Sequence, residues 1–325
     1  VSTGYLAGLI EQNYPMNDYN DPRWNGRLPR WKNILFEHLT FNDHITTVGA
    51  EAFKDSTGLK RITFNDNYIT DINASAFENS AVVGVVLPES VKNVKMYAFK
   101  NCNNLLDITF LRNDTMISEE VGTIPGSSDI GIEKYNRNTD KYNRRHGFPV
   151  INGKGGGPVE AWVNKFNSGT KISYNFMSIT DSKGTIIDWK YDIDEANGTI
   201  KNLYIGNEVN GTVRIPKSIN GYLVKEVGNI TTSDANGNVI IRDITGKQID
   251  EDEEGNAISD ENTTLFVLMI PDTVETIGRY VVVNAPNLIE IYNEAYFPQN
   301  FEYTMSNGEK LDTTKSAFIN VGTTT

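Results

Sequence analysis

Short apolar segments recur at a fixed spacing in the first third of the chain. Four triplets begin 23 residues apart: Leu39-Thr40-Phe41, Ile62-Thr63-Phe64, Val85-Val86-Leu87 and Ile108-Thr109-Phe110. The first and third residues of each triplet are apolar, and the middle residue is Thr or Val. This alternation is typical of a strand with one buried face, so the pattern predicts four short, equivalent strands.

Three further markers recur between the triplets: an Ala-Phe pair, a small residue and an apolar residue. They are Ala52-Phe53, Ser56 and Leu59, then Ala76-Phe77, Ser80 and Val82, then Ala98-Phe99, Cys102 and Leu105. A period of about 20 to 29 residues with apolar positions at set offsets indicates a leucine-rich-repeat solenoid, in which every coil contributes one strand. Each marker should therefore form a ladder of like residues, about 4.8 Å apart, through the core.

One of these units resembles a known family. Residues 85–94, which read VVLPESVKNV, and residues 98–102, which read AFKNC, resemble the BspA-type leucine-rich repeat of bacterial surface proteins. The resemblance covers residues 39–110 well and parts of residues 200–293 more loosely, although Pro88 and Cys102 each occur in one unit alone. It implies an extracellular, non-catalytic scaffold for recognition or adhesion.

The second half of the chain predicts hairpins and a second array. Short apolar segments between residues 172 and 230 are divided by turn phrases such as Asn210-Gly211. Residues 212–228 and 268–293 again resemble repeats of the family, with Val281-Val282 at the place of the Ala-Phe pair. Residues 231–263, which contain the acidic run 250–254, form a hairpin-rich excursion between these two units.

Two helices are predicted outside the repeats. The first follows Asp129, stops at Gly147 and carries a basic face that either docks an acidic surface or is simply solvated: Lys134, Arg137, Lys141, Arg144 and Arg145. The second begins at Pro158 after the glycine run 153–157, which reads as a linker. The residues Val159, Trp162, Val163 and Phe166 share one face of this helix, which should cap the second half of the chain.

These elements predict a mostly β fold with short helices, namely a leucine-rich-repeat solenoid in two arrays with helical and hairpin caps. The expected segments are an N-terminal cap (1–38), a first array with its closing helix (39–151), a glycine linker and helix (152–170), and hairpins with the second array and tail (171–325). Trp24 and Trp31 in the cap cover the first coil or, alternatively, form an exposed aromatic ligand site. The start at Val1 suggests a processed or excised terminus.

The composition limits the kinds of partner that we expect this chain to bind. A net charge of -12 argues against binding nucleic acid. No apolar run approaches the roughly 18 residues that a membrane span needs. The single cysteine excludes an intrachain disulfide, and because Cys102 occupies the ladder position of Ser56 and Ser80, we expect it to be a small buried residue.

The sequence contains no recognisable set of catalytic residues. His38, His44 and His146 do not have the spacing of metal ligands, and no serine lies in a Gly-x-Ser-x-Gly elbow. The acidic run at residues 250–254 lacks the spacing of an EF-hand, although calcium remains the one ion that its oxygen ligands would suit. The sequence therefore predicts that the protein is not an enzyme and has no catalytic residue, metal ligand or cofactor.

The middle residues of the triplets are the candidate binding face. Thr40, Thr63, Val86 and Thr109 should point outward in one row, although Thr is also a common strand former. The expected function is adhesion to, or recognition of, a protein or glycan of a host or neighbouring cell, at the cell surface or in the extracellular space. The alternatives are a self-assembling subunit of a surface filament or layer, and the non-catalytic part of a larger secreted protein.

Overall fold

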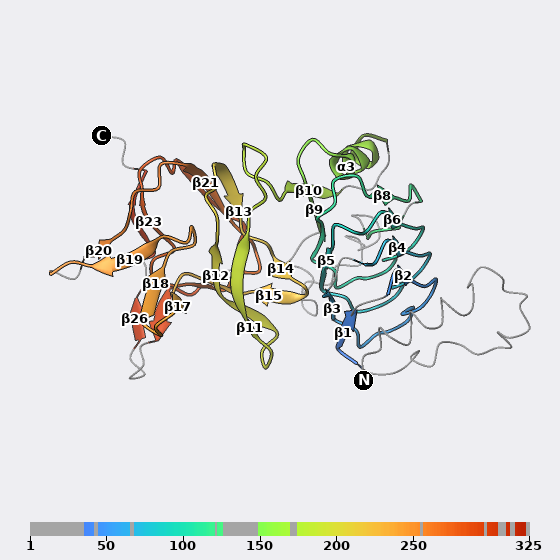
Figure 1. The fold of residues 1–325 in the computed structure, drawn as a ribbon, viewed down its shortest axis with the longest axis horizontal. Helices are drawn as coiled ribbons and strands as arrows, with labels where there is room; N and C mark the ends of the chain where they lie inside the picture. Colours follow the sequence, from blue (N-terminus) through green and yellow to red (C-terminus); the bar gives the residue numbers. More distant parts are fainter. Residues whose placement is uncertain are drawn as a thin grey trace, which may run out of the picture. The chain divides into compact units, whose positions relative to one another are not determined.

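The fold is given by a computed structural model that describes residues 36–41, 45–65, 68–120, 122–125, 149–169, 174–253, 256–295, 298–304, 310–312 and 316–322. The chain divides into two compact units, Val1–Ile179 and Thr180–Thr325. Both units are built mainly from strands (Figure 1), as the sequence predicted.

The predicted triplets are strands of one parallel sheet in the first unit. Its order is β1-β3-β5-β7-β9-β10. The strands are β1 (His38–Phe41), β3 (Arg61–Phe64), β5 (Gly84–Leu87), β7 (Asp107–Phe110), β9 (Val150–Gly153) and β10 (Asn175–Ser178). Leu39 is paired with Ile62, and Val85 with Ile108, so the triplets are in register from coil to coil. The prediction of four equivalent strands is confirmed.

A second parallel sheet, made of two-residue strands, forms another side of the same coils. Its order is β2-β4-β6-β8. The strands are β2 (Thr47–Val48), β4 (Asp71–Ile72), β6 (Asn93–Val94) and β8 (Met116–Ile117). Beyond each of the first three, the Ala-Phe turn donates backbone hydrogen bonds to the next coil. The Phe53 N–H donates to the Ala76 carbonyl over 2.7 Å, and the Phe77 N–H donates to the Ala98 carbonyl over 2.8 Å.

The Phe ladder fills the centre of the first unit. Phe53, Phe77 and Phe99 are fully buried. The Phe77 ring stacks on Phe53 with the centroids 5.5 Å apart and on Phe99 with the centroids 5.3 Å apart. Cys102 is also fully buried, with its sulfur 3.3 Å from the Ser80 hydroxyl, and burial raises the pKa of its thiol to about 12. Cys102 is therefore a core residue, as predicted, and not a reactive thiolate.

The predicted position of the second helix was wrong. α3 (Pro158–Gly169) packs its apolar face onto the core of the first unit instead of capping the second half. The Trp162 indole N–H donates to the Ser118 carbonyl over 3.2 Å, and the Trp162 and Tyr174 rings lie 5.0 Å apart. Figure 1 shows α3 beyond β8, at the opposite end of the stack from β1. Because only residues 154–157 join β9 to α3, the glycine run is a tight turn here and not a linker.

The second unit contains three coils of a second array. Its main parallel sheet is β13-β21-β24. The strands are β13 (Gly211–Arg214), β21 (Leu265–Ile270) and β24 (Glu290–Asn293), with β16 (Glu226–Val227) and β22 (Thr276–Ile277) on a second side and β23 (Val282–Ala285) and β27 (Phe318–Val321) on a third. Val281 and Val282 are fully buried at the place of the Ala-Phe pair, and β23 pairs with β27 of the tail. The tail thus completes the third coil.

Hairpins surround these coils. A four-stranded sheet has the order β11-β12-β15-β14. Its strands are β11 (Trp189–Asp194), β12 (Thr199–Ile205), β14 (Ser218–Ile219) and β15 (Tyr222–Val224), and a separate hairpin joins β25 (Glu302–Thr304) to β26 (Lys310–Asp312). β11 runs antiparallel to β12, and its residue Trp189 is paired with Ile205. The hairpin that turns at residues 195–198 is therefore present, whereas the hairpin predicted at Asn210-Gly211 is not, because β13 pairs in parallel with β21.

The excursion between the first two coils is a meander of antiparallel strands. In order these are β17 (Ile230–Ser233), β18 (Val239–Arg242), β19 (Gln248–Glu251) and β20 (Ala257–Ile258). The phrase Asp-x-x-Gly recurs at intervals of nine residues, at Asp234, Asp243 and Asp252. The first two carboxylates each accept backbone N–H groups from the residues two and four positions later, and Asp252 accepts one from Asn256. This second period was not predicted from the sequence.

Asp243 differs from its equivalents because it is fully buried. Burial raises its pKa to about 6, although the hydroxyl of Thr245 and the N–H groups of Val283, Lys247 and Thr245 donate to the carboxylate and oppose the rise. Between the ordinary value of 3.8 and about 6 the folded state holds more protons than the unfolded state. The stability that this group contributes is therefore complete below pH 3.8 and is lost as the pH rises through about 6.

We predict that the carboxyl carbon of Asp243 titrates in NMR with a midpoint near pH 6. Asp234 is the matched control, because its exposed carboxylate lies in the same type of turn and its pKa is lowered by hydrogen bonds from Asn238. Asp243→Asn should remove the titrating resonance, and melting curves of the variant should show a smaller loss of stability between pH 3.8 and about pH 6. A midpoint at or below the usual Asp value would contradict the prediction.

Candidate functional site

The predicted outer row of the first unit is present as a structural feature. Thr40 is paired with Thr63, and Val86 is paired with Thr109, at equivalent positions of adjacent strands. All four side chains are half-buried. The row continues on the same sheet through Asn152, which is paired with both Thr109 and Met177. The structure therefore gathers the four predicted residues on one face.

Neighbouring side chains engage two hydroxyls of this row. His38 Nε2 lies 2.9 Å from Thr63 Oγ1, and the Asn152 amide donates to Thr109 Oγ1 over 3.1 Å. At its edge, the Lys60 ammonium lies 2.8 Å from the Glu37 carboxylate, and both side chains are exposed. The row is thus a neutral strip of hydroxyl and methyl groups beside an exposed ion pair. Trp24, Trp31 and the predicted basic helix lie outside the described residues.

A second candidate, which the sequence analysis missed, is a groove in the second unit. It has a volume of about 540 Å³ and lies between the hairpin β11–β12 and the start of the meander at β17. Its lining combines two tyrosines with charged, amide and hydroxyl side chains: Lys190, Tyr191, Asp192, Asn202, Tyr204, Thr231, Thr232 and Ser233. We refer to this site as the tyrosine groove. Its volume lies within the roughly 300 to 1,000 Å³ that is usual for small-molecule sites.

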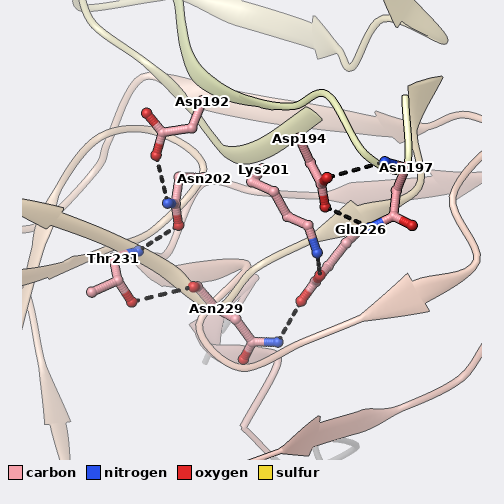
Figure 2. Close-up of polar contacts among 8 residues, drawn as sticks. All are labelled: Asp192, Asp194, Asn197, Lys201, Asn202, Glu226, Asn229 and Thr231. Atoms are coloured by element: carbon pink, nitrogen blue, oxygen red, sulfur yellow. Dashed lines mark hydrogen bonds and ion pairs between the residues drawn. The ribbon is translucent and has the colours of Figure 1, made fainter. Parts of the chain in front are cut away.

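Asn202 connects the strands that line the tyrosine groove. The pairing of β11 with β12 shifts register between Lys190 and Asp192, and Asn202 on β12 has a φ of 50°. The Asn202 amide nitrogen donates to Asp192 over 2.7 Å, and its oxygen accepts the backbone N–H of Thr231 over 2.9 Å. Figure 2 shows this link from Asp192 through Asn202 to Thr231. The bulge therefore orients the Asn202 side chain so that it connects β12 with β11 and β17.

The polar contacts continue away from the groove towards the coils. In Figure 2 the Lys201 ammonium reaches Glu226, at 3.8 Å, and Glu226 accepts the amide of Asn229 over 2.8 Å. At the end of the hairpin, Asp194 accepts the side-chain amide of Asn197 over 2.8 Å, and hydrogen bonds from Asn197 lower the pKa of Asp194. The ion pair of Lys201 with Glu226 therefore joins the β11–β12 hairpin to β16 of the first coil.

The two tyrosines present partly buried aromatic surface. Tyr191 and Tyr204 both pack against the core of the second unit, and burial raises the pKa of Tyr191. The Arg242 guanidinium lies 5.5 Å from the centre of the Tyr204 ring and donates to Thr232 Oγ1 over 3.2 Å. Contacts of this kind hold a ring in place. The Tyr204 ring is therefore held between Arg242 and the core of the second unit.

The charges of the groove are matched by partners. Lys190 forms an ion pair of 2.9 Å with Asp188, whose hydrogen bond raises the pKa of Lys190, while Asp192 accepts the amide of Asn202. Arg242 also donates to the Gly246 carbonyl over 2.8 Å. The lining therefore has neither a positive nor a negative excess of charge. A ligand would be bound by hydrogen bonds and by contact with aromatic surface.

Within the described ranges, no group of three or more His, Cys, Asp and Glu side chains is arranged to hold a metal ion. In the acidic run, Glu251 accepts the hydroxyl of Tyr280 over 3.0 Å, and Asp250 accepts the amide of Gln248 over 3.1 Å. The prediction about calcium stays a prediction. The described helices include none with the length and hydropathy needed to cross a membrane.

The comparisons with known proteins give the family of the repeats. The BspA type leucine rich repeat region matches residues 30–122 in 6 copies. No curated protein matches the chain. Among solved structures, a leucine rich cell surface protein from Faecalibacterium prausnitzii A2-165 is similar at 15% identity, with 81% of this chain and 62% of that chain covered and a TM-score of 0.19.

A leucine-rich repeat protein from Bacteroides ovatus ATCC 8483 is similar at 10% identity, with 87% of this chain and 62% of that chain covered and a TM-score of 0.17. The chain therefore spans 62% of the length of each of these proteins, and both likenesses are too low to carry an argument. The coils that contain β1 to β8 and the match of residues 30–122 identify the family of this part of the chain. This part of the chain is a BspA-type leucine-rich repeat region.

Proposed function

We propose that this protein is a non-enzymatic recognition protein of the bacterial cell surface or extracellular space, which binds a protein or glycan through the outer row of its first array. The single observation that carries the proposal is the register that places Thr40 beside Thr63 and Val86 beside Thr109 on one parallel sheet. The family match of residues 30–122 to repeats of the BspA type supports it.

The chemistry of the row suits a flat contact. Its side chains are neutral and rise on strands about 4.8 Å apart, so a partner would be held by packing and by hydrogen bonds to hydroxyl and amide groups. The exposed pair of Lys60 and Glu37 at the edge adds little, because surface ion pairs contribute only about 0 to 1 kcal/mol. A rigid sheet also loses little conformational freedom when it binds.

A charged double variant tests this row. Thr63→Arg with Thr109→Arg adds bulk and charge at two row positions, so binding to immobilised extracellular-matrix proteins or mucin glycans should weaken at least about tenfold in surface plasmon resonance. Thr57→Arg with Asn103→Arg is the matched control, since both residues are exposed in turns away from the row. Equal binding by the two variants would refute the assignment of the row, provided that circular dichroism shows both to be folded.

A second candidate function is self-assembly, because the last coil of the second array leaves apolar side chains exposed. Ile291 is paired with the buried Leu268, yet it is 37% exposed, and its neighbours Ile289 and Tyr292 are 74% and 52% exposed. Among the described strands β24 pairs only with β21. An open edge of this kind can accept a strand from a second copy of the chain.

Sedimentation velocity over a range of concentrations tests self-assembly. If β24 joins copies, the sedimentation coefficient should rise with concentration, and Ile291→Lys should abolish the rise by placing a charge at the open edge. Lys183→Glu is a suitable control, since this exposed residue lies in a turn away from β24. A concentration-independent monomer would argue against this function and leave the recognition proposal standing.

A further inference from the structure

We propose that the tyrosine groove is a binding site for a neutral oligosaccharide. This goes beyond the proposed function, since the groove lies in the second unit and shares no residue with the row of Thr40, Thr63, Val86 and Thr109. The inference starts from one juxtaposition: two tyrosine rings, a carboxylate, an amide and three hydroxyl side chains line a single hollow of about 540 Å³.

The lining matches the two kinds of surface that a sugar ring presents. The axial C–H groups of a pyranose form an apolar face that packs on an aromatic ring, which Tyr191 supplies. The equatorial hydroxyls both donate and accept hydrogen bonds. An ionised carboxylate offers about four acceptor positions, of which Asn202 takes one at Asp192, so acceptor capacity is left for sugar hydroxyls.

The pairing of charges favours a neutral ligand over an anionic one. Lys190 faces the partner Asp188 at 2.9 Å, and Arg242 is held by Thr232 and the Gly246 carbonyl. Neither cation is therefore presented as an isolated positive charge to a sulfate or carboxylate. The net charge of -12 for the whole chain also disfavours polyanions.

The groove is built in advance of binding. Asn202 has a left-handed backbone at the register shift, and its side chain ties β11 to β17 through Asp192 and the Thr231 N–H. These two hydrogen bonds hold the Asn202 side chain between β11 and β17. A second hollow in this unit, of about 300 Å³, has no aromatic residue in its described lining and so lacks the stacking surface.

The test uses the full chain and named sugars. Maltohexaose, cellohexaose, mannohexaose and chitohexaose are screened by saturation-transfer-difference NMR, with a heparin hexasaccharide as the charged comparison, and hits are titrated by calorimetry. We expect at least one neutral sugar to bind. Its Kd should rise at least tenfold in Asp192→Ala and in Tyr191→Ala, whereas Tyr68→Ala, at an exposed tyrosine of the first unit, should leave it unchanged.

Tyr191 packs on the core, whereas the Asp192 side chain is exposed. If Tyr191→Ala lowers the melting temperature, the Asp192→Ala variant alone decides the test. The proposal is overturned if none of the neutral sugars binds, if heparin alone binds, or if Asp192→Ala binds as the wild type does. Sugar binding lost in the Thr63→Arg and Thr109→Arg variant but kept in Asp192→Ala would assign the sugar to the row. That result would overturn the groove and leave the proposed recognition function intact.

Discussion

The register between adjacent coils is the constraint on which the first unit depends. Each Ala-Phe turn donates its backbone N–H groups to the next turn, and the Phe77 ring stacks at nearly equal distances on Phe53 and Phe99. A slip of one residue would move every inward side chain to the outer face. The same register therefore produces both the apolar core and the outer row, since each outward residue lies between two inward ones.

The second unit is also built from coils in register, but other segments are inserted between them. Its three coils share the β13-β21-β24 sheet, while the hairpin β11–β12 and the meander β17–β20 are added around them. The tyrosine groove lies where these two additions meet, and Asn202 joins them. Repeats thus provide a rigid support, and the segments that depart from the repeat provide the most varied chemistry.

The sequence predicted the coils well because the apolar residues of the triplet, the Ala-Phe pair, the small residue and the last apolar residue recur in each period, and strands in register bury them together. The sequence did not predict where α3 packs. The apolar residues of an amphipathic helix show which of its faces is buried, but they do not show which part of the protein covers that face. In the structure Trp162 packs beside Tyr174 of the first unit. The groove was missed for a related reason. The left-handed backbone of Asn202 and its bonds to Asp192 and Thr231 depend on tertiary pairing that the local sequence does not encode.

Hydrogen–deuterium exchange in Phe77→Ala tests the central claim, that stacking between coils stabilises the first unit as a whole. Removing a buried Phe costs about 3 to 5 kcal/mol, and Phe77 contacts both neighbouring rings. The account predicts faster exchange throughout residues 45–110 and unchanged exchange in residues 265–293, which belong to the second unit. Faster exchange confined to the peptide that contains residue 77 would contradict it.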